Sequence, residues 1–420
     1  MSTRPHITAW LICIATAAIY LAFPTRVYYW DGIVFAQTIE GVARLSPSLV
    51  HPNHLIYNFA GYLFYKLLRA FSADIRALTA LQILNCLLGA LCARVLFSIL
   101  METLRSFYFS IWLTLLFAFS ATWWKFSTDA DAYIPSVLFL LISFYLVLPG
   151  RKPRPLLTAF TFFLSMAFHQ LAVFMFPVLV LGVYLQDGPT TLSRRVLNVF
   201  YFSVVATALI VVAYAWLFYL ASGSSDLARL MRWTASYSPD ADTSFGLWSN
   251  LRYSLRGQMR LFLGGRFNSL RGLWNPAIIV LLLCLIAALI VFVFELLRNL
   301  KRAKLRLETR QKTVLLLSLM WAAVYIMFLF FWLPQNTFYR LFYLPALILL
   351  LGLALASVKN ARSESRALAA FVIVIALANF IFLIYPTSRP SPHTARKRQT
   401  ASSYIAVSNS PRRRAARELR

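Results

Sequence analysis

Long apolar runs separated by short polar and basic stretches are the dominant pattern along this 420-residue chain. An α-helix needs roughly 17–25 apolar residues to cross a bilayer. The stretch from Leu156 to Leu185 is long enough for two short crossings that turn near His169 and Gln170. The other long runs lie at 78–99, 196–221, 276–297, 313–333 and 367–385, and shorter ones lie at 7–23, 106–122, 134–149 and 340–357. The pattern predicts an all-α polytopic membrane protein with about eleven transmembrane helices.

The segment 54–71 is apolar but also carries histidine, asparagine, lysine and arginine side chains. If it crossed the membrane, the basic clusters at 151–154 and 298–312 would move outside, against the positive-inside rule. We therefore predict an interfacial helix, with the N-terminus inside and the C-terminus outside. The density of Lys and Arg is then roughly threefold higher in the inner loops than in the outer ones. The domain prediction is a single transmembrane domain over 1–385, with outer loops at 24–77, 123–133 and 222–275, and a basic tail at 386–420.

Composition agrees with this pattern and excludes a soluble fold. The chain is 60% hydrophobic and only 13% charged, whereas about a quarter of the residues in a soluble domain are charged. The 41 Lys and Arg against 14 Asp and Glu give a formal net charge of +27. Because the basic residues lie in short clusters between apolar runs, the charge indicates the loops of a membrane protein that contacts lipids, and no nucleic-acid partner is expected.

Asp31 is the first candidate for chemistry, since it follows the first apolar run closely and is preceded by Tyr28, Tyr29 and Trp30. A carboxylate bordered by aromatic rings near the membrane surface can have a raised pKa and act as a general base. The alternative is that Asp31 caps a helix that begins at Gly32.

The second predicted outer loop carries Asp129 and Asp131 at a spacing of two. A D-x-D pair in an extended loop can hold one divalent cation or orient hydroxyl groups. The alternative is that Thr128 or Asp129 caps the next helix.

Histidines are the other polar groups expected on the outer side. His51 and His54 are three residues apart and could bind zinc, but the sequence offers no definite third ligand. They and His169 could instead hydrogen-bond a phosphate or a sugar, or pack the interfacial helix.

Arginines are concentrated in the fourth predicted outer region. Between 250 and 260 they recur at every fourth position with apolar residues beside them, which predicts an amphipathic helix on the membrane. Such a helix holds anionic head groups or grips a lipid-linked phosphate, for which the guanidinium fork is suited. Arg266, and Arg340 in the loop PQNTFYR, are further phosphate candidates, with snorkelling to the interface as the alternative.

The order of these features resembles the GT-C superfamily of integral-membrane glycosyltransferases, especially its protein O-mannosyltransferase-like and aminoarabinose-transferase-like branches. YYWDG is similar to the first-loop acidic motif, and HPNHLIYNFAGYLFYKLL to the H-P-P-x-Y helix, with Asn53 in place of the second proline. FSATWWKFSTDADAYIPSVLFLL resembles the F-S-P-x-x-W…A-E-x-Y stretch, with Asp131 in place of the glutamate. FLSMAFHQ is similar to a segment of the superfamily that contains G-N-H, and His169 corresponds to the histidine of that segment. The match covers about residues 7–185.

This resemblance implies a glycosyltransferase in a cell membrane, the inner membrane of a bacterium, that transfers a hexosyl or pentosyl group. The donor would be a sugar on a polyprenyl phosphate, and the acceptor a glycan, lipid or protein on the outer face. Asp31 would be the general base, with Asp129 and Asp131 as further catalytic candidates. The candidate substrate-binding residues are His51, His54, Tyr133, His169, Arg266 and Arg340. Metal dependence varies within the superfamily, so no cofactor is certain and a divalent cation stays an option. The alternatives are a transporter or flippase for a lipid or polyol, and an O-antigen-ligase-like transferase.

Overall fold

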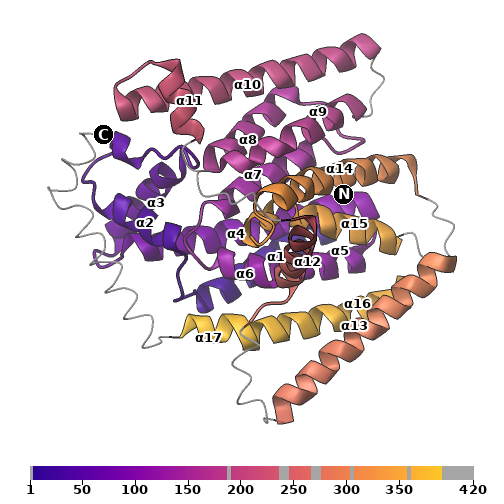
Figure 1. Cartoon of the computed structure of the whole chain (residues 1–420). Coiled ribbons are helices and arrows are strands. Elements are labelled where there is room, and N and C mark those ends of the chain that lie inside the picture. The colour runs from indigo at the N-terminus through magenta and orange to yellow at the C-terminus, as the bar shows by residue number, and fades with distance from the viewer. Residues whose placement is uncertain are drawn as a thin grey trace.

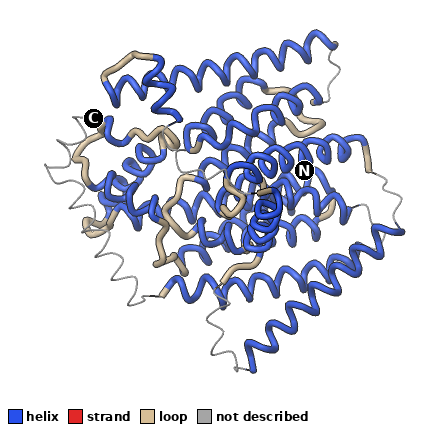
Figure 2. The backbone as a smooth tube through the Cα atoms, viewed as in Figure 1, coloured by secondary structure: helices blue, strands red, loops and turns tan. Residues whose placement is uncertain are grey.

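The computed structural model of the chain describes residues 3–186, 191–235, 246–265, 276–302, 307–356 and 361–389. Within these ranges every regular element is helical and no strand occurs (Figure 2). Five of the described helices are long and apolar enough to cross a bilayer, or six if one bent pair counts as a single crossing. Shorter apolar helices accompany them. These findings confirm the predicted all-α polytopic class, while the number of eleven crossings stays a prediction.

The N-terminal part of the chain supplies most of the central helices (Figure 1). Its elements are α1 (Thr3–Ala22), α2 (Trp30–Glu40), η1 (Pro47–Leu49), α3 (Tyr57–Phe71), α4 (Ala77–Leu104), α5 (Phe107–Ala118), α6 (Ala121–Ser127), α7 (Tyr133–Leu146), α8 (Pro155–Phe168), η2 (Gln170–Met175) and α9 (Phe176–Leu185).

The C-terminal part adds long helices around this centre, and α13 runs alongside α16 at the edge of the molecule (Figure 1). Its elements are α10 (Leu192–Ser222), α11 (Leu227–Ala235), α12 (Leu247–Phe262), α13 (Pro276–Arg302), α14 (Thr309–Trp332), η4 (Phe338–Phe342), α15 (Leu344–Ala356), α16 (Ala361–Asn379), η5 (Phe380–Ile384) and α17 (Tyr385–Ser388).

The apolar run predicted at 106–122 is broken in the structure. It forms α5 and α6, whose axes differ by 65°, so residues 123–127, predicted as loop, are helical. The break frees backbone carbonyls inside an apolar core, where an unpaired carbonyl is costly. Two distant side chains bind them: the Tyr20 hydroxyl donates to the Ala118 carbonyl at 2.5 Å, and the Asn379 amide donates to the Phe119 carbonyl at 2.9 Å.

Helix α4 is the centre of the fold, since it packs against α1, α5 and α7 along its length and against α2 and α3 near its first residue. Gly89 lets α6 approach closely, because a Cβ atom there would lie 2.7 Å from the Ser127 Oγ. This contact fixes α6, and therefore the loop that follows it, on the surface of α4.

Two amide side chains in the first turns of α4 organise the loops above it. Gln82 donates to the carbonyls of Thr25 and Thr128 at 2.8 and 3.0 Å. Asn85, one turn further on, donates to the carbonyls of Asp129 and Asp131 at 2.8 and 2.7 Å. Both amides are buried, so the first and second predicted outer loops are attached to one helix by bonds shielded from water.

We expect Asn85→Leu to lower the thermal unfolding temperature clearly. The two carbonyls left unpaired in a buried site each cost about 1–3 kcal/mol. Leu87→Ala, on the same helix at a position that is 37% exposed, is the matched control and should shift the temperature far less. Equal shifts for the two variants in detergent-solubilised protein would contradict a role for Asn85 in holding the loop.

Candidate active site

Asp31 lies in the first turn of α2, which begins at Trp30 with Tyr29 as its N-cap. No side-chain capping bond is formed, so the alternative that Asp31 caps a helix starting at Gly32 is wrong. A carboxylate in a first turn is favoured by the helix dipole. Burial nevertheless raises the pKa of the Asp31 carboxyl above its ordinary value, which is the direction a general base requires.

The first and second predicted outer loops touch at Gly32. A Cβ atom at this position would lie 2.3 Å from the Ala130 carbonyl oxygen, so only glycine permits the approach. Beside it, the Tyr29 backbone N–H donates to Asp129 Oδ2 at 3.0 Å. Tyr29 and Gly32, which flank Asp31 in the sequence, both contact the second loop, and these contacts position Asp31.

Asp129 is fully buried and accepts hydrogen bonds at both oxygens, from Tyr29 and from the Ala130 backbone N–H at 2.9 Å. The Lys125 ammonium lies 3.9 Å from its Oδ2. Burial raises the pKa of Asp129 to about 6, against the opposing effects of Lys125 and the two backbone bonds. Since α7 has Ala132 as its N-cap with no side-chain bond, neither Thr128 nor Asp129 caps it.

Asp131 is buried almost as completely as Asp129, at 1% exposure. Its Oδ1 accepts a long 3.4 Å bond from the Tyr133 backbone N–H, while its Oδ2 is buried and has no hydrogen-bond partner among the described residues. Burial, followed by the negative charges of Asp31 and Asp129, raises the pKa of Asp131 strongly. The three predicted carboxyl groups therefore form one cluster, although no three His, Cys, Asp or Glu side chains in the described ranges could together hold a metal ion.

Four of the predicted substrate-binding residues form a continuous row of rings. Ring centroids are 5.1 Å apart between His51 and His54, 4.6 Å between His54 and His169, and 4.8 Å between His169 and Tyr133. Burial lowers the pKa of His51 to about 4 and that of His169 to about 3. The histidines are therefore neutral near pH 7. The loop that carries His51 is bound to the end of α8, because Ile56 and Gln170 exchange backbone bonds with Ala167 and Asn53.

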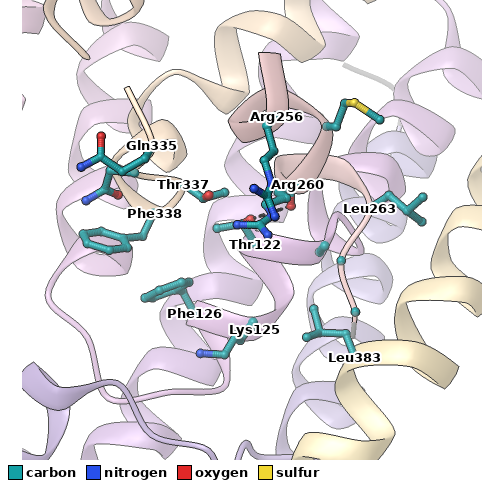
Figure 3. Close-up of a pocket in the computed structure, with 15 residues that line it drawn as sticks. Thr122, Lys125, Phe126, Arg256, Arg260, Leu263, Gln335, Thr337, Phe338 and Leu383 are labelled. Atoms are coloured by element: carbon teal, nitrogen blue, oxygen red, sulfur yellow. Dashed lines mark hydrogen bonds between the residues drawn. The ribbon is translucent and has the colours of Figure 1, made fainter. Parts of the chain in front are cut away.

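A cavity of about 1200 Å³ opens beside the acid cluster, and we call it the cationic cavity (Figure 3). Arg256 and Arg260 enter it from α12, and Lys125 enters it from α6 on the opposite side. Its remaining described lining is apolar or uncharged and includes no acid. Positive charge concentrated in a concave site with no local acid favours an anion.

Arg340 supports one wall of this cavity and does not line it. The side chain is 1% exposed, and its guanidinium donates to the carbonyls of Asn336 and Pro334 and to the Tyr343 hydroxyl, at 2.7–3.0 Å. The Tyr343 hydroxyl accepts a 2.6 Å bond from Gln258 on α12. A Cβ atom at Gly257 would lie 2.4 Å from the Arg340 Nε. Arg340 thus holds α12 in place, which favours a structural role for it over direct phosphate binding.

Several functional features were missed or misplaced by the sequence reasoning. Lys125, Gln82 and Asn85 were not singled out, although polar amides one turn apart inside an apolar run are a recognisable signal. Trp123 and Trp124, in the stretch that resembles F-S-P-x-x-W, are buried among core aromatic rings and do not line the cationic cavity. Arg266 lies outside the described residues.

Comparison with solved structures shows a likeness to ArnT from Cupriavidus metallidurans, whose crystal structure contains bound undecaprenyl phosphate. The two folds superpose with a TM-score of 0.58 at 12% sequence identity, over 92% of this chain and 78% of that one. No protein-family model and no curated protein sequence matches the chain. The likeness extends well beyond residues 7–185, so the chain has a GT-C-like fold in an integral membrane protein.

Proposed function

We propose that this protein is a membrane glycosyltransferase that moves a sugar from a polyprenyl phosphate to an acceptor on the outer face of a bacterial inner membrane. The observation that carries the proposal is the adjacency of a buried acid cluster and a cationic cavity, linked by Lys125, which lines the cavity and pairs with Asp129. The ArnT-like fold supports it, since ArnT was crystallised with undecaprenyl phosphate.

The cationic cavity is the proposed site of the donor phosphate. Arg256 and Arg260 offer guanidinium donors suited to phosphate oxygens, and Lys125 adds a third positive charge. On the same helix Leu251, Leu255 and Met259 are exposed, at 42%, 59% and 73%. These apolar side chains would meet the membrane, so a prenyl chain could remain in lipid while its phosphate enters the cavity.

Asp31 is the proposed general base. Its carboxylate takes the proton of the acceptor hydroxyl as that oxygen bonds to the anomeric carbon of the sugar. The bond from this carbon to the phosphate oxygen breaks, and the electron pair leaves with the lipid phosphate. The cations of the cavity stabilise the charge of the departing phosphate. A single displacement of this kind inverts the configuration at the sugar.

The other predicted residues have supporting roles in this scheme. Asp129 orients Lys125 and fixes Tyr29, two residues before the base. The Asp131 Oδ2, buried and without a hydrogen-bond partner among the described residues, is available to a substrate hydroxyl group. The row from His51 to Tyr133 provides neutral rings and ring nitrogens for hydroxyl groups of the substrates.

Replacement of Asp31 by Asn should abolish transfer in cells. In a deletion strain, lipid extracts should show an undecorated acceptor that disappears when the wild-type gene is returned. Asp31→Asn, at normal membrane levels, should leave the acceptor undecorated, because a general base contributes about 10²–10⁴-fold to the rate. Asp74→Asn, at an exposed acid of the same loop, should restore decoration. Full restoration by Asp31→Asn would refute the assignment.

The pH dependence of transfer should show a base with a raised pKa. Because burial raises the pKa of Asp31, kcat/KM should increase with pH and level off above a midpoint higher than the ordinary aspartate value of about 3.9. Burial lowers the pKa of His51 to about 4 and that of His169 to about 3, so both histidines are neutral between pH 5 and 7. His51→Gln should therefore keep the midpoint even if it changes the rate. A profile that falls as pH rises from 5 to 7 would contradict a carboxylate base.

Binding of undecaprenyl phosphate to the purified protein tests the cationic cavity. Arg256→Gln and Arg260→Gln should each weaken binding by about tenfold or more, since a charged hydrogen bond contributes about 1.5–3 kcal/mol. Arg252→Gln is the matched control, because Arg252 lies on the same helix but does not line the cavity. Equal effects of all three substitutions would show that only the overall charge of α12 matters.

A further inference from the structure

A second cavity, of about 730 Å³, lies between η2, α10, α11 and α14, and His169 of the ring row lines it. We call it the apolar cavity. Its volume lies within the range of small-molecule and cofactor sites. Most of its described lining is aliphatic or aromatic and comes from four elements, for example Val173, Phe174, Ile210, Val211, Leu230 and Phe328.

Some of the polar groups of the apolar cavity lie close together, since the His169 and Tyr339 rings are 6.0 Å apart and the Gln170 N–H donates to the Asn53 carbonyl. Asn53, His169 and Tyr339 all line it. The Asn53 Oδ1 is buried and accepts no hydrogen bond from the described residues. The His169 Nδ1 accepts a 3.1 Å bond from the Leu171 N–H, so the proton of the neutral ring is on Nε2. An acceptor and a donor are thus both present where a hydroxyl group of a ligand could bind.

These polar residues adjoin the proposed reaction centre. Tyr339 lines the apolar cavity and its neighbour Phe338 lines the cationic cavity. The Tyr133 ring packs against both, with centroids 5.7 Å from Tyr339 and 5.3 Å from Phe338. The negative charges of Asp31 and Asp131 add to the burial that raises the pKa of Tyr339 to about 12. The acid cluster is therefore close to the place where the two cavities come nearest.

The two cavities differ in the charge of the side chains that line them. The cationic cavity has three positive side chains, whereas the apolar cavity has no Asp, Glu, Lys or Arg in its described lining. Arg229 is on α11, one of the helices around this cavity, but it is 66% exposed and is not part of the lining. A ligand with a phosphate or carboxylate head would lose its hydration in the apolar cavity without gaining a counter-charge, which is strongly unfavourable.

We propose that the apolar cavity binds the acceptor, and that this acceptor is an uncharged lipid with a free hydroxyl group. The proposal rests on the proposed function and names the class of its second substrate. The chain of the lipid lies along η2, α10 and α14, and its hydroxyl reaches Asn53 and His169. From there Asp31 removes the hydroxyl proton, the oxygen bonds to the anomeric carbon, and the phosphate leaves into the cationic cavity.

Photolabelling of the purified full-length protein tests this inference. The probe is a monoacylglycerol with a diazirine in its acyl chain, and the comparison probe is the lysophosphatidic acid with the same chain. The monoacylglycerol should label the peptides around 170–175 and 210–214 at least tenfold more than the anionic probe. Equal labelling by the two probes, or stronger labelling by the anionic one, would overturn the proposal.

A matched pair of variants on α10 locates the label. Val211 lines the cavity and Val212 does not, and the two side chains are exposed to similar extents, 57% and 65%. Val211→Trp should reduce labelling at least fivefold and Val212→Trp by less than twofold, with undecaprenyl phosphate binding unchanged in both. Leu230→Arg should shift the preference toward the anionic probe. Equal labelling of the two tryptophan variants would show that the probe lies elsewhere.

Competition by undecaprenyl phosphate tests whether the apolar cavity holds the donor chain. Together with the variants, it also separates failure of the acceptor assignment from failure of the proposed function. If undecaprenyl phosphate displaces the monoacylglycerol from the wild-type cavity, the cavity holds the donor chain and the acceptor assignment is wrong. If Asp31→Asn retains transfer, the proposed function fails while labelling still reports what the cavity binds. If Asp31→Asn and Arg256→Gln behave as expected but labelling does not, only the acceptor class is wrong.

Discussion

The hydrogen bonds of Gln82 and Asn85 are the constraint on which the rest of the site depends. Each amide of α4 donates to two loop carbonyls in a buried environment, where such bonds are strong and an unpaired carbonyl is costly. They attach the chain after α1 and the chain after α6 to one rigid helix. Asp31, Asp129 and Asp131 come together because these two segments have a common support, although about 100 residues separate them in sequence.

The acid cluster and the cations of the cationic cavity lie next to each other but in separate parts of the site. The acids are enclosed by aromatic rings and backbone donors, and the cations of α6 and α12 border a separate, open cavity. Lys125 connects them, since its ammonium is close to Asp129 and also lines that cavity. Arg340 supports α12 through the Tyr343 hydroxyl, which accepts hydrogen bonds from both Arg340 and Gln258 of that helix. This separation of acids and cations suits the proposed transfer, in which Asp31 would act as the base and the cationic cavity would bind the phosphate.

Apolar run length was sufficient to predict most of the helices, because a bilayer imposes its thickness directly on the sequence. It was insufficient at 106–122, where Tyr20 and Asn379 bind the carbonyls released by a 65° break. Motif reasoning singled out Asp31, the D-x-D acids and the residues from His51 to Tyr133, and the structure brings them into a cluster and a row, while their roles stay a proposal. Motif reasoning did not place Trp123 and Trp124 in the core, since their packing partners include Phe117, which lies before the bend, and Phe380, which is remote in sequence.

The sequence by itself determined that the chain is an all-helical membrane protein and which short segments carry its acids, histidines and arginines. These properties follow from local hydrophobicity and residue type. Only the tertiary structure decided that the acids form one cluster, that Arg340 is a support for α12, and that a cationic and an apolar cavity lie on either side of Phe338 and Tyr339. The physical reason is that the burial of a side chain, its pKa and the charge of a cavity depend on which distant segments of the chain lie together. Buried hydrogen bonds between those segments determine this arrangement.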